Sequence, residues 1–287
     1  CWISRRRKKI GKARAYMNQP TVTTTKTQLA HELGIARQTL YYQPVQPKKD
    51  EQLKQQIVSV MAAHPAYGHR RIAIALGLNK KSILRVMNLC GLRPRIRRKH
   101  PHKPLDEGTA PTSIPNLGYK LCPLQPNVLW AGDFTYFWNE GRFIYLATVI
   151  DVYTREVIGW HIANHHTTDL IQRAFSDAAA RRGTTPQIFH SDQGSEYTSQ
   201  LFMVMLYYYD VQPSHSTKSS PWQNGFQESL YSQFKLELQA DQYPERGQLM
   251  AAIYQQLHYY NTKRIHTALK MAPLQFFQHY VLNKQVI

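Results

Sequence analysis

The sequence predicts a mixed α/β layer domain preceded by an all-α, DNA-binding region with a helix-turn-helix. Its 287 residues allow about two domains. Residues 1–120 carry 24 Lys and Arg against 5 Asp and Glu, whereas residues 121–287 carry 12 against 13. Helical periodicity before residue 104 gives way to alternating, aromatic-rich segments after residue 121. A basic region joined to a nearly neutral domain indicates nucleic-acid binding, and a basic protein without such a partner is the alternative.

The basic N-terminal segment, residues 1–49, contains a pattern typical of a helix-turn-helix. Between residues 25 and 42, an apolar helix face that includes Leu29 is followed by Gly34 and by a second apolar segment. Arg37 lies near the start of that second helix, where such motifs contact DNA bases or phosphates. Many helical hairpins share this pattern, so a plain hairpin is the alternative.

A second helical, DNA-binding region is predicted for residues 50–103. After a proline-punctuated linker at 44–50, an amphipathic helix is followed by two shorter ones, the last with Asn79 as its N-cap. The outer side of this last helix carries three cations that we expect to contact DNA, namely Lys80, Lys81 and Arg85. The arm RPRIRRKHPHK at 93–103 fits phosphates or a minor groove, and a solvated linker is equally compatible with it.

A linker rich in Pro, Thr, Ser and Gly at residues 104–120 separates this region from the predicted core at 121–287. The core begins with three strands and continues with helices and strands in alternation, which is typical of a mixed sheet covered by helices. The expected segments are a strand at 127–138, two strands within 142–162 joined by a turn at Asp151–Arg155, a helix at 167–183, a strand, turn and helix within 186–203, and a helix at 225–240.

Three acids of this core are candidates for chemistry. Asp133 lies in the middle of the first strand, where a buried carboxylate is costly unless it is paired or bound to metal. Asp192 follows the fourth strand, at the edge where α/β sheets present their sites. Glu228 lies on the last helix within about 20° of Lys235, away from the apolar stripe. Capping of the next helix by Asp192 and a helix-dipole role for Glu228 are the alternatives.

Three carboxylates from two strands and one helix can hold two divalent cations, and hard oxygen ligands suit Mg²⁺ or Mn²⁺. Such pairs of ions serve in-line phosphoryl transfer. Neighbouring groups have structural interpretations: Asp151 shapes the turn after the second strand, Glu196 belongs to the start of the next helix, and His190 is structural. The three cysteines and thirteen histidines form neither a disulfide framework nor a zinc spacing.

Several stretches resemble the motifs of bacterial insertion-sequence transposases with a retroviral-integrase-like (DDE) catalytic core. WAGDFTYF, HSDQGSEYTS and SPWQNGFQESLYSQFK resemble the three acidic motifs, with 35 residues between Asp192 and Glu228 and with Lys235 seven residues beyond the glutamate. HPAYGHRRI at 64–72 resembles the signature of the helical region before the core, and YYNTKRIHTALKMAP at 259–273 resembles the C-terminal motif.

The resemblance implies an RNase H-like fold and Mg²⁺-dependent DNA cleavage and strand transfer, with Mn²⁺ as a substitute. Asp133, Asp192 and Glu228 would be the catalytic, metal-binding triad. Water and then a 3′-hydroxyl would attack, without a covalent intermediate. Three residues match positions near DNA in that family, and these are Lys235, Trp222 and Asn224. Packing is the alternative role for Trp222.

The resemblance also implies partners and a cellular setting. Double-stranded DNA, as element ends and target, would be the partner, with a homo-oligomer assembled on it. No leucine-zipper heptads precede residue 25, so the chain resembles the second-reading-frame product, which would act with a first-frame partner or fusion. A location in the bacterial cytoplasm at the nucleoid, without membrane attachment, is expected.

Two other functions compete with this one. A DNA-binding regulator or inactive element remnant would need no triad, and the intact triad argues against it. A structure-selective nuclease of the same fold would cut without joining, and it would not need the basic helical region or the C-terminal motif.

Overall fold

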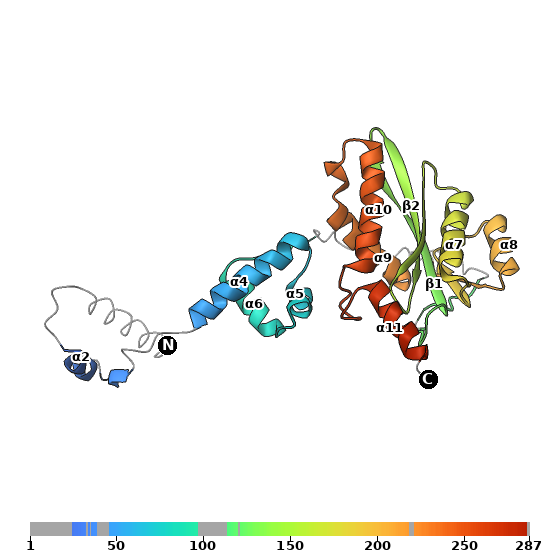
Figure 1. Cartoon of the computed structure of the whole chain (residues 1–287). Helices are drawn as coiled ribbons and strands as arrows, with labels where there is room; N and C mark the ends of the chain where they lie inside the picture. The colour runs from blue at the N-terminus through green and yellow to red at the C-terminus, as the bar shows by residue number, and fades with distance from the viewer. Residues whose placement is uncertain are drawn as a thin grey trace. The chain divides into compact units, whose positions relative to one another are not determined.

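The computed structural model describes residues 25–32, 34, 36–38, 46–96, 114–119, 121–217 and 221–285. The chain divides into two compact units, Cys1–Gln55 and Gln56–Ile287, and the second contains the whole mixed sheet (Figure 1). None of the helices in the described part of the chain is long and apolar enough to cross a membrane.

The first unit contains the start of the predicted helix-turn-helix. Helix α2 spans Lys26–Glu32, and Gly34 follows it with φ of +61°, a conformation that glycine adopts without strain. Arg37 is exposed in a helical turn. Most of the second helix of the predicted motif lies outside the described residues, so the motif stays a prediction.

The predicted linker at 44–50 is wrong for its described part. Helix α4 begins there and spans Gln46–Ala63. Pro47 is its second residue, a place where proline costs little because the first-turn N–H groups have no intrahelical acceptor. Ile57 is fully buried, as the amphipathic pattern predicted.

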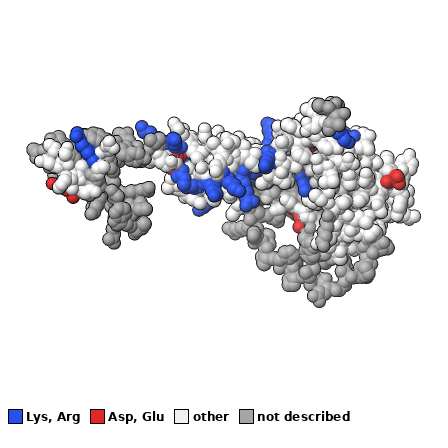
Figure 2. All heavy atoms as spheres, turned by 90° about the horizontal axis from the view of Figure 1, so that it is seen from below, with Lys and Arg blue, Asp and Glu red and all other residues white. Residues whose placement is uncertain are grey.

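Two short helices follow, as predicted. Helix α5 spans His69–Leu76 and packs against α6, which spans Lys80–Leu89. The side chain of Asn79 accepts a hydrogen bond from the Lys81 N–H at 2.8 Å, so the predicted N-cap is confirmed. Lys80, Lys81 and Arg85 are all exposed. Figure 2 shows Lys and Arg side chains gathered over this helical region.

The core contains a five-stranded mixed sheet in the order β3-β2-β1-β4-β5. The first three strands form an antiparallel meander, and β4 and β5 add to β1 in parallel. This is the sheet expected of an RNase H-like fold, so the predicted fold class is confirmed. The strands are β1 Leu129–Asn139, β2 Arg142–Asp151, β3 Val157–Ala163, β4 Ile188–Ser191 and β5 Gln212–His215.

Helices cover both faces of this sheet and enclose two hydrophobic clusters (Figure 1). One cluster joins the sheet to α7, Thr168–Arg182, and α8, Gln200–Tyr208. The other joins the opposite face to α9, Gly225–Leu238, and α10, Arg246–Thr262. The chain then forms α11, Pro273–Gln285, while single 3₁₀ turns occur at Pro221–Asn224 and Ala240–Gln242.

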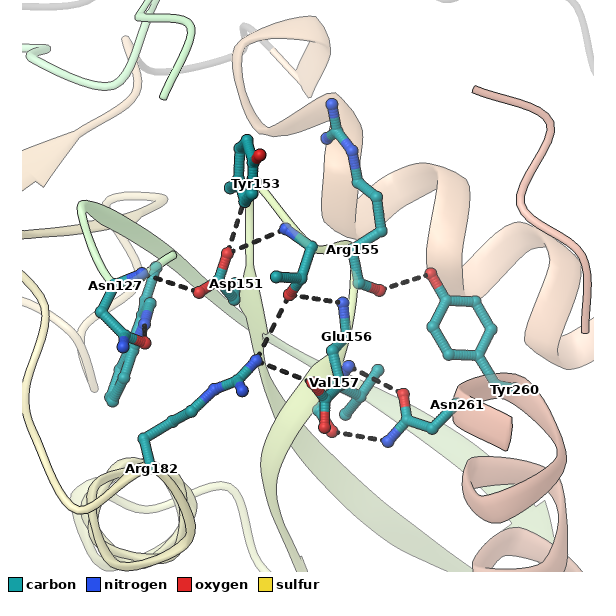
Figure 3. Close-up of polar contacts among 11 residues, drawn as sticks. Asn127, Asp151, Tyr153, Arg155, Glu156, Val157, Arg182, Tyr260 and Asn261 are labelled. Atoms are coloured by element: carbon teal, nitrogen blue, oxygen red, sulfur yellow. Dashed lines mark hydrogen bonds and ion pairs between the residues drawn. The ribbon is translucent and has the colours of Figure 1, made fainter. Parts of the chain in front are cut away.

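The turn between β2 and β3 is fixed by a buried carboxylate. Asp151 is fully buried, and its oxygens accept hydrogen bonds from the N–H groups of Asn127, Tyr153 and Thr154 at 2.8–3.0 Å (Figure 3). These bonds satisfy the charge without a cation, because three backbone dipoles point at it. Asp151 therefore shapes this turn, as the sequence predicted.

The two motifs at 64–72 and 259–273 contact each other. The Tyr67 hydroxyl accepts a hydrogen bond from the Ile265 N–H at 2.7 Å, and Arg71 Nε donates to the Ile265 carbonyl at 3.0 Å. His64 Nδ1 lies 2.7 Å from the Tyr259 hydroxyl. The helical region at 64–72 is thus attached to the core through side chains of the first motif, which contact the Ile265 backbone and the Tyr259 side chain of the second.

Candidate active site

The parallel pairing of β1 with β4 brings two of the three acids together. The last paired residues are Ala131 and His190, so two residues further on Asp133 and Asp192 continue the same register. β4 ends at Ser191, and the edge of β1 is free of a strand neighbour from Gly132 onward. Asp133 is half-buried there, while Asp192 is exposed just beyond the end of β4.

Helix α9 brings the third acid to the same place through hydrogen bonds to the β1 backbone. Gln227 Nε2 donates to the Ala131 carbonyl at 2.5 Å, and the Tyr231 hydroxyl donates to the Asp133 carbonyl at 2.6 Å. Glu228 follows Gln227 directly and is exposed. Because Gln227 and Tyr231 are buried one turn apart, they fix the distance and rotation of α9 relative to the strand.

The charges at this place are close enough to change one another's ionisation. Burial, together with the negative charges of Asp192 and Glu228, raises the pKa of Asp133 to about 8. A hydrogen bond from the Phe134 N–H and the positive charge of Lys235 act in the opposite direction. The three carboxylates therefore interact electrostatically, and the negative charges near Asp133 disfavour its ionised form.

Lys235 lies two turns along α9 on the side of Glu228. Its Nζ is 5.0 Å from the centre of the Tyr136 ring and 5.5 Å from that of Phe137. These rings hold the ammonium beside β1. The sequence predicted this placement from the spacing on the helix.

A second acid lies near Asp192 and is paired. Glu196 accepts a hydrogen bond at 3.1 Å from Ser195 Oγ and lies 2.5 Å from His166 Nδ1. Burial alone would raise the pKa of Glu196, but the hydrogen bonds from His166 and Ser195 lower it overall. Glu196 lies in a turn, and the next helix begins four residues later, at Gln200. Asp192 accepts from the Gly194 N–H at 3.0 Å, and the N-cap of α8 is Ser199.

His190 is a packing residue. It is buried, its Nδ1 lies 2.9 Å from Ser214 Oγ, and burial lowers its pKa to about 4. The structural interpretation of His190 is supported by these contacts. Among the described residues, no group of three His, Cys, Asp or Glu side chains is arranged closely enough to hold a metal ion as it stands.

Sequence reasoning missed the residues that position the site. Gln227 lies on the buried stripe of α9 and also accepts a hydrogen bond from Thr148 Oγ1 at 3.0 Å, while Thr148 Oγ1 lies 2.8 Å from the Tyr231 hydroxyl. The available signal was a glutamine at an apolar-stripe position, one turn before Leu230 and Tyr231. Gly132 was missed too: a Cβ there would lie 2.4 Å from the Phe189 ring, so only glycine fits.

Two of the predicted DNA contacts, Asn224 and Trp222, lie in the turn before α9. Asn224 is buried and its Nδ2 donates to the Gly132 carbonyl at 3.4 Å, while its Oδ1 has no partner among the described residues. The side chain of Trp222 lies outside the described part of the chain.

Comparison with known proteins decides the family. The family model described as "Integrase core domain" matches residues 123–221, and a second model of that description matches residues 209–273. The transposase of insertion sequence element IS904 from Lactococcus lactis is 33% identical over 240 residues, which are 80% of this chain and 94% of that protein. The chain belongs to the insertion-sequence transposases. It is an enzyme of DNA transposition and integration, a DDE polynucleotidyl transferase.

The chain is also similar to a second transposase and, more distantly, to two solved structures. The putative transposase InsK of IS150 from Escherichia coli is 26% identical over 87% of this chain and 92% of that protein. Among solved structures, a simian T-cell lymphotropic virus intasome chain aligns with a TM-score of 0.47 and 18% identity over 77% of this chain and 74% of that one. The HTLV-2 integrase catalytic core domain in complex with magnesium aligns with a TM-score of 0.41 and 23% identity over 54% of this chain and 98% of that one.

Proposed function

We propose that this transposase cleaves the ends of its insertion element and joins the 3′-hydroxyl to target DNA, with Asp133, Asp192 and Glu228 as the catalytic acids. The observation that carries the proposal is the convergence of the three carboxylates at the free edge of β1, where the pKa of Asp133 rises to about 8. Each acid comes from a different element, so only the fold brings them together.

The donor chemistry of the three acids fits a pair of divalent cations such as Mg²⁺ or Mn²⁺, although the described carboxylates would have to move closer together to share an ion. Their donor atoms are hard carboxylate oxygens, which these ions prefer. Among the described residues the carboxylate of Asp133 accepts one hydrogen bond, from the Phe134 N–H, and the negative charges of Asp192 and Glu228 outweigh the positive charge of Lys235. Asp133, Asp192 and Glu228 would hold the ions, which when bound activate an attacking oxygen and stabilise a leaving one.

The chemistry is two exchanges at phosphorus. In the first, the oxygen of water forms a bond to the scissile phosphorus, the bond to the 3′-oxygen breaks, and that oxygen leaves as a 3′-hydroxyl after gaining a proton. In the second, this 3′-hydroxyl forms a bond to a phosphorus of the target strand and displaces another 3′-oxygen. No side chain forms a bond to DNA in either step.

Cationic side chains would hold the DNA against the triad. Lys235 lies on the side of α9 that carries Glu228, where it would contact a phosphate near the cut. Lys80, Lys81, Arg85 and Arg37 are exposed, which suits contacts to the backbone of the element end. Asn224 would reach DNA only after the turn before α9 rearranges, because its side chain is buried. Trp222 is proposed as a further DNA contact from the resemblance alone.

The assembly on DNA is proposed from the family. Two element ends and a target must meet in one complex, which a homo-oligomer would provide. A first-frame partner or fusion would add recognition of the ends, and the protein would act at the bacterial nucleoid.

The test uses a plasmid that carries the gene with its natural flanks. The protein is incubated with this plasmid and Mn²⁺, nicks are mapped to the nucleotide, and joined products are sequenced. The proposal expects nicks at the element ends, joined products, and the loss of both in Glu228→Gln. Since Glu228 is exposed, this variant keeps the fold and DNA binding. Nicks that persist in Glu228→Gln contradict the proposed triad, and nicks without joined products favour a nuclease.

A further inference from the structure

A cavity of about 540 Å³ lies on the side of α9 that faces away from Glu228. Phe226, Leu230 and Gln233 line it, and at about 100° per residue these positions lie some 140° to 160° around the helix from Glu228. Ser229 also lines the cavity and lies only about 100° around the helix from Glu228, so the cavity extends from the far side of α9 toward the triad.

The charge of this cavity is strongly positive. Three guanidinium groups line it, those of Arg71, Arg155 and Arg264, and none of its described lining residues is acidic. Arg264 Nε donates to Glu237 at 2.8 Å, and Arg71 Nε donates to the Ile265 carbonyl at 3.0 Å. One of the three positive charges is therefore paired, and two remain to attract an anion.

Arg155 is a half-buried cation of the cavity lining. Its guanidinium stacks 4.1 Å from the centre of the Phe226 ring, and the described residues give it no ion-pair partner. In Figure 3 its side chain extends away from the hydrogen bonds around Asp151. The backbone fixes its base, because the Tyr260 hydroxyl donates to the Arg155 carbonyl at 3.1 Å. A stacked guanidinium presents its N–H fork at fixed geometry, which suits the oxygens of a phosphate.

A buried histidine atom in the same cavity lacks a partner. His266 lines the cavity, and its Nδ1 is buried without a hydrogen bond among the described residues. Burial, reinforced by the positive charges of Arg155, Arg264 and Arg71, lowers the pKa of His266 to about 4, so the ring is neutral at pH 7. The wall of the cavity therefore includes a neutral histidine with a buried ring nitrogen that has no partner among the described residues.

We propose that this cavity binds a phosphodiester group of the DNA strand beside the one that is cut, with Arg155 as its principal ligand. The inference rests on the proposed function, because a strand that reaches Glu228 brings phosphates past Ser229, the next residue of α9 and a lining residue of this cavity. The anion that is available at this cavity is therefore a phosphate of the DNA backbone. The DNA strand is then held at two places beside α9, at the triad and at this cavity.

The experiment measures DNA affinity against salt for the full chain, with every variant in a Glu228→Gln background so that cleavage plays no part. Arg155→Asn removes the guanidinium at a residue with φ of +62°, a conformation that asparagine tolerates. Ser229→Glu adds a carboxylate at an exposed lining position and leaves Arg155 in place. The matched controls are Arg173→Gln on α7 and Gln255→Glu on α10, both exposed and outside the cavity.

The proposal expects Arg155→Asn and Ser229→Glu to bind a labelled DNA duplex about ten-fold more weakly at low salt. The slope of log affinity against log salt should fall by about 0.9 in Arg155→Asn, the value for one phosphate contact. Both controls should keep the parent affinity and slope.

Equal slopes in Arg155→Asn and its parent overturn the proposal, as does an equal loss in the controls. Inorganic phosphate that shifts the His266 imidazole resonances, with DNA slopes unchanged, also overturns it and identifies a small-anion site instead. Nicks that persist in Glu228→Gln would contradict the proposed triad and leave these binding slopes unaffected, so the two failures are distinguishable.

Discussion

Asp133 and Asp151 lie on neighbouring strands of one sheet, and the hydrogen bonds around them differ. Three backbone N–H groups donate to Asp151, which is fully buried at the end of β2. The carboxylate of Asp133 receives one such bond, from Phe134, and feels the charges of Asp192 and Glu228. A carboxylate whose donors are supplied by the backbone stabilises a turn, whereas one surrounded by other acids needs a ligand from outside.

The β2–β3 turn and the surroundings of α9 also differ in how their polar groups are paired. The carboxylates of the turn are paired, as in the ion pair of 2.7 Å between Arg182 and Glu156, although Arg182 Nε is buried without a hydrogen-bond partner among the described residues (Figure 3). Beside α9, the Asp133 carboxylate lies among like charges, and His266 Nδ1 is buried without a partner among the described residues. Both arrangements are costly, and a bound ligand would offset that cost.

The largest expected effect is on cleavage in Asp192→Asn. This change removes one charge of the triad, and we expect cleavage to fall by about 10³-fold or more because transition-state stabilisation of several kcal/mol is lost. The free energy of unfolding should change by less than about 0.5 kcal/mol, since the side chain is exposed and the amide oxygen can still accept from Gly194. Cleavage assays and urea unfolding check both. A loss of stability that accounts for the lost cleavage would break the comparison.

The next largest effect is on the stability of Asp151→Asn. Unlike Asp192→Asn, this variant should lose stability and keep its cleavage activity. The asparagine amide has only one oxygen. Its NH₂ group would therefore face a backbone N–H that now donates to the second carboxylate oxygen, and two donors cannot form a hydrogen bond. We expect the free energy of unfolding to fall by about 3 kcal/mol. Urea unfolding measures this, and Asp210→Asn, at an exposed turn, is the matched control. Cleavage per folded molecule should stay unchanged.

The sequence could propose the three acids, because each lies in a motif with local signals. It could not locate the groups that position them: Gln227 meets Ala131 and Thr148 across long sequence separations, which no local pattern reveals. It also placed the start of α4 wrongly, since a proline in a first helical turn has the same local appearance as one in a linker.

The antiparallel meander followed from alternation, but the order of the sheet did not. The insertion of β1 between β2 and β4 depends on the crossover helix α7, whose packing on β2 and β3 is a tertiary property. The contact between the motifs at 64–72 and 259–273 was equally invisible, because the Ile265 backbone that it uses carries no sequence signal.

A smaller effect concerns His266 and pH. Its pKa in the folded protein, about 4, is below the ordinary value of 6.5, so the unfolded state binds the proton first. The contribution of the neutral His266 ring to the free energy of unfolding is fully present above about pH 6.5 and is lost as pH falls toward 4. Urea unfolding between pH 7 and 4 should therefore show a slope that is shallower in His266→Gln by up to one proton. Equal slopes in the two proteins would contradict the assignment of His266 to the unsatisfied groups.

The smallest expected effect is that of Lys235→Gln. Removing this ammonium should lower the salt slope of DNA binding by about 0.9 and weaken binding a few-fold, because one phosphate contact is lost. Lys270→Gln, an exposed change in the C-terminal motif, is the control. Identical slopes for the two variants would remove Lys235 from the DNA-facing side of α9.

The measurement that tests the comparison most directly is cleavage of a labelled element-end duplex at rising Mn²⁺ by Asp133→Asn and Asp151→Asn, each corrected for its folded fraction. The account predicts wild-type cleavage per folded molecule in Asp151→Asn. In Asp133→Asn it predicts no cleavage at any metal concentration, in a protein at least as stable as the wild type. Cleavage that survives in Asp133→Asn, or is absent from folded Asp151→Asn, would contradict it.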